Sequence, residues 1–249
     1  GTLVRIDLRG KGESSYLPVD LKPPLLVAAE TQSETLVLVS REDGQVRLVD
    51  TRNFSLRPDR LSSGKPVSRL IASDDKGKLY LISADDCARS EIHELSVDRR
   101  SFSLRRLASL SGVVRGLSAP EGAEEVFAVA GDALYRIAPD GAAPQRVRIG
   151  ENTRAVVASG DRVFVCAGLD QVYVLDRKLK KRPERIPVEM GPGPLLIRDG
   201  KLYVVNCLSN SITVLNVKNL EEEVSVLLGV LLGRMYYRDH KIVVNNLFR

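Results

Sequence analysis

Residues 201–216, KLYVVNCLSNSITVLN, contain two short runs of bulky apolar residues on either side of a polar centre. The runs at 202–206 and 212–216 are rich in β-branched and aromatic residues, and each has the length of a typical strand. Ser209 and Asn210, which lie between them, belong to the residue types that tight turns prefer. The segment therefore predicts an antiparallel strand–turn–strand unit.

The first run of this unit recurs along the whole chain. Successive copies start 43, 47, 37, 39 and 40 residues apart, at Leu36, Leu79, Val126, Val163, Leu202 and Ile242. A second run follows each of the first five copies after 8 to 13 residues, starting at Val46, Ile92, Leu134, Val172 and Ile212. A period of about 40 residues with short strands is typical of a β-propeller, in which each repeat forms one four-stranded blade.

The sixth copy, at Ile242, finds its second run near the other end of the sequence. Residues 3–7, LVRID, match the second-run pattern, and residues 16–19 match the strand that follows it. Counted through both ends, Leu3 lies 10 residues after Ile242, which is within the range of the other units. We therefore expect an all-β fold, a single six-bladed propeller of four-stranded blades whose N-terminal strands complete the last blade and close the ring. The blades are expected at residues 25–66, 67–112, 113–151, 152–193, 194–230, and 231–249 together with 1–24. The alternatives are an open β-solenoid or two small sandwiches.

The fifth repeat also resembles a known family. Residues 201–216, with Gly193 and Pro194 before them and Asp199-Gly200 at the inner turn, are similar to the YVTN repeat of surface-layer and NHL-like (WD40-like) propellers. The match is good in the fifth blade and partial in the second and fourth. The resemblance implies a binding or scaffold propeller of the kind that binds proteins, nucleic acids or glycans. It transfers no catalytic residue to this chain.

Composition narrows the possible functions only slightly. The net charge of +5 mildly favours anionic partners, and the 8 Asn and 4 Gln are few beside 37 basic and 32 acidic residues, which is typical of a thermophile. The three widely spaced cysteines (Cys87, Cys166 and Cys207) do not form a disulfide framework or a CxxC zinc pattern. No apolar run reaches the roughly 20 residues of a membrane span. The location is therefore open between cytoplasm and cell surface, and an upstream domain, signal or anchor is compatible with this sequence.

Four arginines form the main candidate binding site. When the expected inner strands are aligned on the apolar residue that follows, similar positions in blades two, three, four and six hold Arg69, Arg115, Arg154 and Arg234. In a ring they would meet at one mouth of the channel and bind carboxylates or phosphates through forked hydrogen bonds. The alternative is structural: Asp43, Asp86, Asp132 and Asp170 lie in turns on the same face and would pair with these arginines to lock adjacent blades.

A second candidate is the basic run on the opposite face. It comprises Arg177, Lys178, Lys180, Lys181 and Arg182. This patch would dock an acidic partner or a polyanion, although it lacks the interleaved aromatic residues that single-strand nucleic-acid binders use, so nucleic acid is not favoured. The equivalent loop of the next blade carries Glu221, Glu222 and Glu223, which would neutralise the run if the two loops lay side by side.

Catalysis receives little support from the sequence. Blades of about 41 residues leave no room for a lid, and no Ser/His/Asp set or phosphate-binding loop is present. His93 stands among acidic residues, but Glu91 and His93 alternate away from Glu94, so no metal site is expected there, and His240 lies in a turn. We therefore expect a non-catalytic propeller without a cofactor that binds a protein through its arginine-bearing face. The alternatives are a channel-metal hydrolase or lactonase-like enzyme and a module that binds nucleic acid or glycan polyanions.

Overall fold

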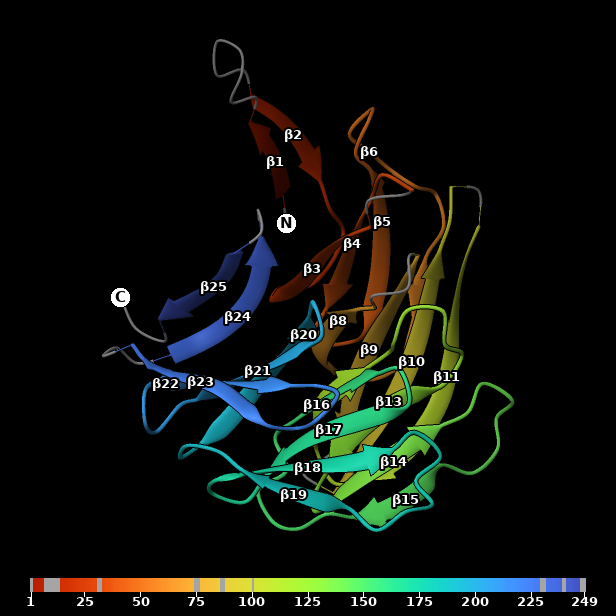
Figure 1. Ribbon diagram of the computed structural model, residues 1–249. Helices are drawn as coiled ribbons and strands as arrows, with labels where there is room; N and C mark the ends of the chain where they lie inside the picture. The colour runs from red at the N-terminus through yellow and green to blue at the C-terminus, as the bar shows by residue number, and fades with distance from the viewer. Residues whose placement is uncertain are drawn as a thin grey trace. The chain divides into compact units, whose positions relative to one another are not determined.

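The computed structural model describes residues 2–6, 14–30, 33–73, 77–85, 88–99, 101–228, 232–238 and 241–246, and every regular element in them is a β-strand. The chain forms two compact units, residues 1–113 and 114–249, each with its own sheets (Figure 1). The expected all-β fold is confirmed. The six copies of the first run lie on β4, β9, β13, β17, β21 and β25, whose bounds follow.

The first unit contains an N-terminal hairpin and two larger antiparallel sheets. The hairpin consists of β1 (Thr2–Ile6) and β2 (Ser14–Pro18). The first sheet has the order β3 (Leu25–Glu30), β4 (Thr35–Ser40), β5 (Gln45–Asp50) and β6 (Ser55–Leu56), with β7 (Leu61–Ser62) also paired to β5. The second sheet has the order β8 (Val67–Ala72), β9 (Lys78–Asp85), β10 (Arg89–Val97) and β11 (Phe102–Ser111).

The second unit contains three four-stranded antiparallel sheets and a C-terminal hairpin. The third sheet consists of β12 (Val114–Ser118), β13 (Val126–Ala130), β14 (Ala133–Ile137) and β15 (Gln145–Arg148). The fourth consists of β16 (Ala155–Ser159), β17 (Arg162–Ala167), β18 (Gln171–Asp176) and β19 (Glu184–Pro187). The fifth consists of β20 (Pro192–Arg198), β21 (Lys201–Asn206), β22 (Ser211–Asn216) and β23 (Glu222–Leu227), and the hairpin pairs β24 (Leu232–Arg238) with β25 (Lys241–Asn246).

The fourth sheet is apolar on both faces because it is packed between the third and the fifth. Along β17, Val163 and Val165 join a core shared with the third sheet, whereas Phe164 and Cys166 join a core shared with the fifth. A strand covered on one face only would alternate apolar and polar residues. The nearly continuous apolar runs of the sequence therefore reflect stacking of sheets face to face.

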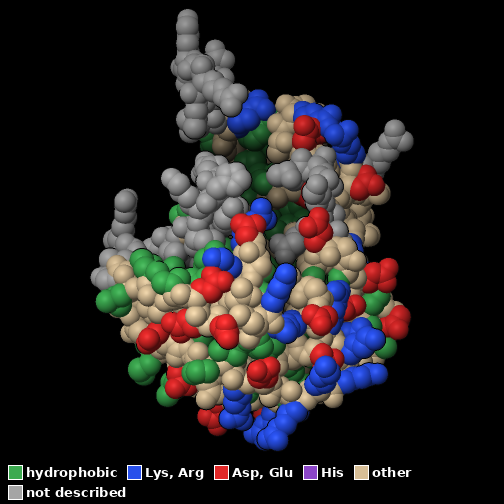
Figure 2. Space-filling model, in the orientation of Figure 1, with side chains coloured by type: hydrophobic (Ala, Val, Ile, Leu, Met, Phe, Trp, Pro, Cys, Tyr) green, Lys and Arg blue, Asp and Glu red, His purple; other side chains and the backbone are tan. Residues whose placement is uncertain are grey.

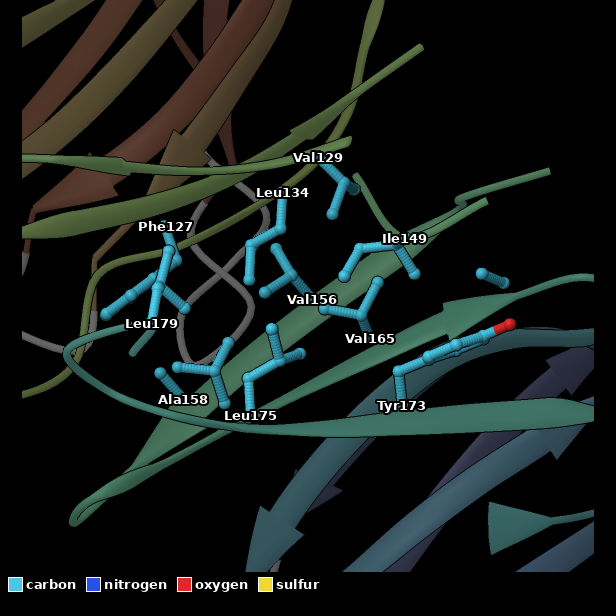
Figure 3. Close-up of a cluster of buried hydrophobic side chains, with 12 residues drawn as sticks. Phe127, Val129, Leu134, Ile149, Val156, Ala158, Val165, Tyr173, Leu175 and Leu179 are labelled. Carbon is cyan, nitrogen blue, oxygen red and sulfur yellow. The ribbon is translucent and has the colours of Figure 1, made fainter. Parts of the chain in front are cut away.

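The core between the third and fourth sheets extends beyond the strands. Leu179, in the loop after β18, is 6% exposed and belongs to this core. Figure 3 shows its side chain beside that of Phe127. The loop that carries the predicted basic run is therefore anchored to the core by an apolar side chain.

The inner strands of the third and fourth sheets approach each other closely at Gly116. A Cβ at this position would lie 3.0 Å from the Ala155 Cα and 3.1 Å from the Val156 nitrogen. Nearby, the Ala158 amide donates a 3.0 Å hydrogen bond to the Ser118 hydroxyl. Only glycine allows this approach without moving one of the two strands.

The outer strand of the first sheet differs from the expected single strand. It is split into β6 and β7, which pair with opposite ends of β5. Pro58 lies in the gap and has no backbone N–H to donate to a ladder. The buried Arg47 side chain fills the gap, because its guanidinium donates to the Asp59 carbonyl at 2.8 Å and its Nε to the Asp20 carboxylate at 3.1 Å.

Each hairpin covers a neighbouring sheet of its own unit. Leu3 and Leu17 of the N-terminal hairpin pack on a cluster that includes Leu38 and Val49 of the first sheet. The Arg5 guanidinium lies 4.8 Å from the centre of the Phe54 ring. In the second unit, β24 contacts β20 and β21 of the fifth sheet.

Candidate functional site

The four predicted arginines are divided between the two units. Arg69 lies in the first unit and is exposed, while the exposed Arg115 and the half-buried Arg154 lie in the second. Arg234 also belongs to the second unit and lies on β24, but its side chain is outside the described part of the chain. A common opening formed by all four residues stays a prediction.

The strand register places these arginines at two positions rather than one. Arg69 pairs with Ile82, the fourth residue of its sheet's first run, whereas in the third and fourth sheets the equivalent partners are Gly116 and Ala155. Arg115 and Arg154 therefore precede that position by one residue. Both β8 and β12 contain a β-bulge at the same place: Ser68 is the extra residue in β8 and Arg115 is the extra residue in β12, so Arg69 follows the bulge whereas Arg115 lies within it.

Arg154 lies beside two cysteines. Its backbone N–H donates to the Cys166 carbonyl at 3.0 Å, and its charge acts on the thiols of both Cys166 and Cys207. Burial raises the pKa of Cys166, an effect to which Cys207 adds and which Arg154 opposes. Burial also raises the pKa of Cys207, again against Arg154. Within the described residues, no carboxylate forms an ion pair with Arg154.

Two of the turn aspartates, Asp132 and Asp43, contact residues of their own sheets. Asp132 pairs with Arg146 at 2.7 Å and with Arg148 at 2.8 Å, both on β15 of its own sheet. Asp43 accepts a hydrogen bond from the Gln45 amide at 3.2 Å. Asp86 lies outside the described residues. Asp132 therefore reinforces its own sheet rather than locking Arg154 to the next one.

The basic run forms a well-defined loop. The Asp176 carboxylate accepts hydrogen bonds from the backbone N–H groups of Lys178, Lys180 and Lys181, at 3.0, 3.0 and 2.7 Å. These bonds, with that of Lys181 the strongest contributor, lower the pKa of Asp176. The loop therefore directs its lysine side chains into solvent, and all three are exposed.

Arg177 and Arg182 differ although both belong to this run. Arg177 forms an ion pair with Glu125 and donates to the Gly160 carbonyl at 3.0 Å, so it ties the fourth sheet to the third. Arg182 is exposed. Beside the loop lies an open cavity of about 510 Å³, whose charged lining includes Glu125, Arg136, Asp176, Arg177 and Lys178.

The acidic loop of the fifth sheet has partners within its own sheet. Glu223 pairs with Lys201 at 2.6 Å and accepts a hydrogen bond from Asn216 at 3.1 Å. Glu221 accepts one from Asn219 at 2.6 Å. Ion pairing between these two glutamates and the basic loop is not among the contacts of the described residues. On the visible face of the molecule, acidic and basic side chains are interspersed (Figure 2).

His93 forms a charged cluster in the second sheet. Its Nε2 lies 3.8 Å from a Glu91 carboxylate oxygen, and Glu91 also pairs with Lys65 at 3.1 Å and Arg106 at 3.5 Å. Glu94 instead contacts Tyr80 and Arg105. Within the described residues, no three His, Cys, Asp or Glu side chains gather as metal ligands would. His240 and Cys87 lie outside the described part.

No protein-family model and no curated protein matches the sequence. Among solved structures, the dihydro-heme d1 dehydrogenase NirN in complex with DHE is similar, with 16% identity and a TM-score of 0.67 over 93% of this chain. The match covers 53% of NirN, so this chain spans about half of that protein's length. BamB from Moraxella catarrhalis has 12% identity and a TM-score of 0.64, with 99% of this chain and 74% of BamB covered. Apo AztD from Citrobacter koseri has 13% identity and a TM-score of 0.54, with 98% and 86% covered.

Identities this low establish the fold and nothing more specific. The part of the chain that the structure describes contains no helix long and apolar enough to cross a membrane. The narrower resemblance to YVTN and NHL-like repeats stays a prediction. The strand-only elements, the stacked antiparallel sheets and the similar structures together give this chain a β-propeller-type fold.

Proposed function

We propose that this chain is a closed, six-bladed propeller that binds another protein without catalysis. The partner contacts the face that carries Arg69, Arg115, Arg154 and Arg234. The proposal has two parts, the closure of the ring and the use of the arginines, and different observations support them.

Closure is supported by apolar side chains that the hairpin and the fifth sheet leave exposed. Val4 and Tyr16 are cross-strand partners on the hairpin face opposite Leu3 and Leu17, and they are 47% and 69% exposed. On the fifth sheet, Val224 and Val226 are 47% and 42% exposed. If β25 paired with β1, the two hairpins would form one four-stranded blade and bury these side chains together.

The surroundings of Arg154 support the proposal that the chain binds another protein. The Arg154 residue is half-buried, two thiols lie nearby, and among the described residues no carboxylate forms an ion pair with its guanidinium. An incoming carboxylate would supply a counter-charge through a forked hydrogen bond. The backbone of Arg154 is fixed by its hydrogen bond to the Cys166 carbonyl, which lowers the conformational entropy lost on binding.

A peptide selection tests this function. Random dodecapeptides displayed on phage are selected on the wild-type chain. The affinity of the selected peptides is then measured for the wild-type chain, for Arg154→Glu and, as a matched control, for Arg182→Glu. We expect acidic winners whose affinity falls about tenfold or more with Arg154→Glu and stays unchanged with Arg182→Glu. No enrichment of acidic peptides, or full affinity of the acidic peptides for Arg154→Glu, would contradict the role of the arginine.

The basic loop supports a second candidate function, the binding of a polyanion. Lys178, Lys180, Lys181 and Arg182 are exposed on a loop whose backbone is fixed by Asp176. Heparin is a suitable probe, and the affinity should fall steeply between 50 and 200 mM salt, on the order of tenfold or more for several contacts. Lys180→Glu with Lys181→Glu should abolish heparin binding and leave the selected peptides bound.

A further inference from the structure

Three exposed apolar side chains lie on hydrogen-bonded loops of the fourth and fifth sheets. Leu169, Met190 and Leu208 are 55%, 51% and 60% exposed. Leu169 is in the turn between β17 and β18, Met190 precedes β20, and Leu208 follows β21. We name them, with the adjacent Asp170 and Glu189, the apolar loop patch.

Backbone contacts hold the three loops together. The Gly191 N–H donates to the Leu169 carbonyl at 2.6 Å, and the Leu208 N–H donates to the Met190 carbonyl at 3.2 Å. A Cβ on Gly191 would lie 2.6 Å from the Leu208 Cγ, so the leucine side chain rests directly on this glycine. The three apolar residues are therefore fixed neighbours in a constant arrangement.

Two acidic residues, Asp170 and Glu189, lie at the border of the patch. Asp170 and Glu189 are exposed, and within the described residues neither carboxylate forms an ion pair. The two lie close together because the Val188 N–H donates to the Asp170 carbonyl at 2.8 Å. The loop residues 168–170, 188–191 and 207–210 contain no lysine or arginine. The chain as a whole carries a charge of +5, so an acidic border is a local feature.

We propose that the apolar loop patch docks a short segment of another protein that carries large apolar side chains flanked by lysine or arginine. The apolar side chains of the segment cover Leu169, Met190 and Leu208, and its basic side chains pair with Asp170 and Glu189. The inference rests on the proposed protein-binding function and names the chemistry of the partner. Its charge is opposite to that expected of a ligand for the arginines, so the two contacts can be separated.

The same displayed library tests the patch. Peptides selected on the wild-type chain are synthesised with a fluorophore, and their affinities are measured by anisotropy on three variants. The first carries Leu169→Ser, Met190→Ser and Leu208→Ser; the second carries Asp170→Lys and Glu189→Lys; the third is Arg154→Glu. Thermal melting of each variant verifies folding, which these substitutions should preserve because all five patch side chains are exposed.

The expected winners include a class with apolar residues and a positive charge. The triple serine variant should weaken this class about tenfold or more, the double lysine variant should weaken it severalfold, and Arg154→Glu should not weaken it. If all winners lose affinity only with Arg154→Glu, the patch proposal fails and the proposed function stands. If the triple serine variant instead abolishes self-association of the free chain in sedimentation, the occupant is a second copy and the proposal of a foreign segment is overturned.

Discussion

At the scale of single residues, His93 is the group whose protonation the fold opposes most clearly. It is 6% exposed, its Nδ1 is buried without a hydrogen-bond partner in the described residues, and burial lowers its pKa below the ordinary value. The Glu91 carboxylate on β10 opposes this shift, while Arg106 on β11 and Lys65 before β8 reinforce it. The folded state therefore prefers the neutral imidazole.

The pH dependence of stability follows from this preference. The unfolded chain binds a proton at His93 near pH 6.5, whereas the folded chain binds it only at a lower pH. Stability is thus complete above pH 6.5 and falls as the pH drops toward the folded pKa. Urea unfolding at pH 7.5 and 5.5 should show this loss in the wild-type chain and a smaller loss in His93→Gln. An identical pH dependence in His93→Gln and wild type would refute the assignment.

At the scale of elements, the Arg47 contact replaces the missing part of an outer strand. Asp20→Ala should lower the free energy of unfolding by about 1–3 kcal/mol, because it leaves the nearly buried Arg47 guanidinium without its carboxylate. Arg60 is bound to the same carboxylate but is largely exposed, so Arg60→Ala should cost no more than about 1 kcal/mol. Urea denaturation of both variants measures the two free energies of unfolding. An equal decrease in the two variants would contradict the structural role of Arg47.

The elements also show how far the sequence could predict this fold. The strands follow from repeated apolar runs, because a sheet packed on both faces needs them wherever it occurs. The bulges do not follow, since an extra residue in a strand leaves the apolar pattern intact, and the sequence does not show that Arg115 is the extra residue of its strand whereas Arg69 follows the extra Ser68. The split of the outer strand could be anticipated only in part, from Pro58. The contact of Arg47 with the gap could not be anticipated, because it depends on Asp20, which lies 27 residues earlier in the chain.

At the scale of the whole molecule, the candidate surfaces differ in how far the sequence alone could predict them. The sequence predicts the basic run directly, because its residues are nearly consecutive. Only the structure shows that the backbone of this loop is held by Asp176 and anchored by Leu179. The apolar loop patch could not be read, because Leu169, Met190 and Leu208 are far apart in the sequence and meet through backbone hydrogen bonds. Contacts of this kind have no signature in composition or spacing.

Closure of the ring can be tested directly, because it specifies the register in which β25 would pair with β1. In the first sheet Leu38 pairs with Arg47, and the repeat alignment makes Val244 the counterpart of Leu38 and Val4 the counterpart of Arg47. If β25 pairs with β1, Val4→Cys and Val244→Cys should therefore form an intramolecular disulfide, since directly opposed residues of an antiparallel pair have Cα atoms about 4.5–5.5 Å apart. Cys87 and Cys207 are first replaced by serine, and the bond is detected by mass spectrometry of a non-reduced digest. Arg5→Cys with Val244→Cys is the matched control and should not form the bond, because a shift of one residue turns the side chain to the other face. A disulfide that joins two chains instead of one would mean that each hairpin completes the blade of a neighbouring molecule, and equal bond formation in the control would mean that the ends meet only by random encounter.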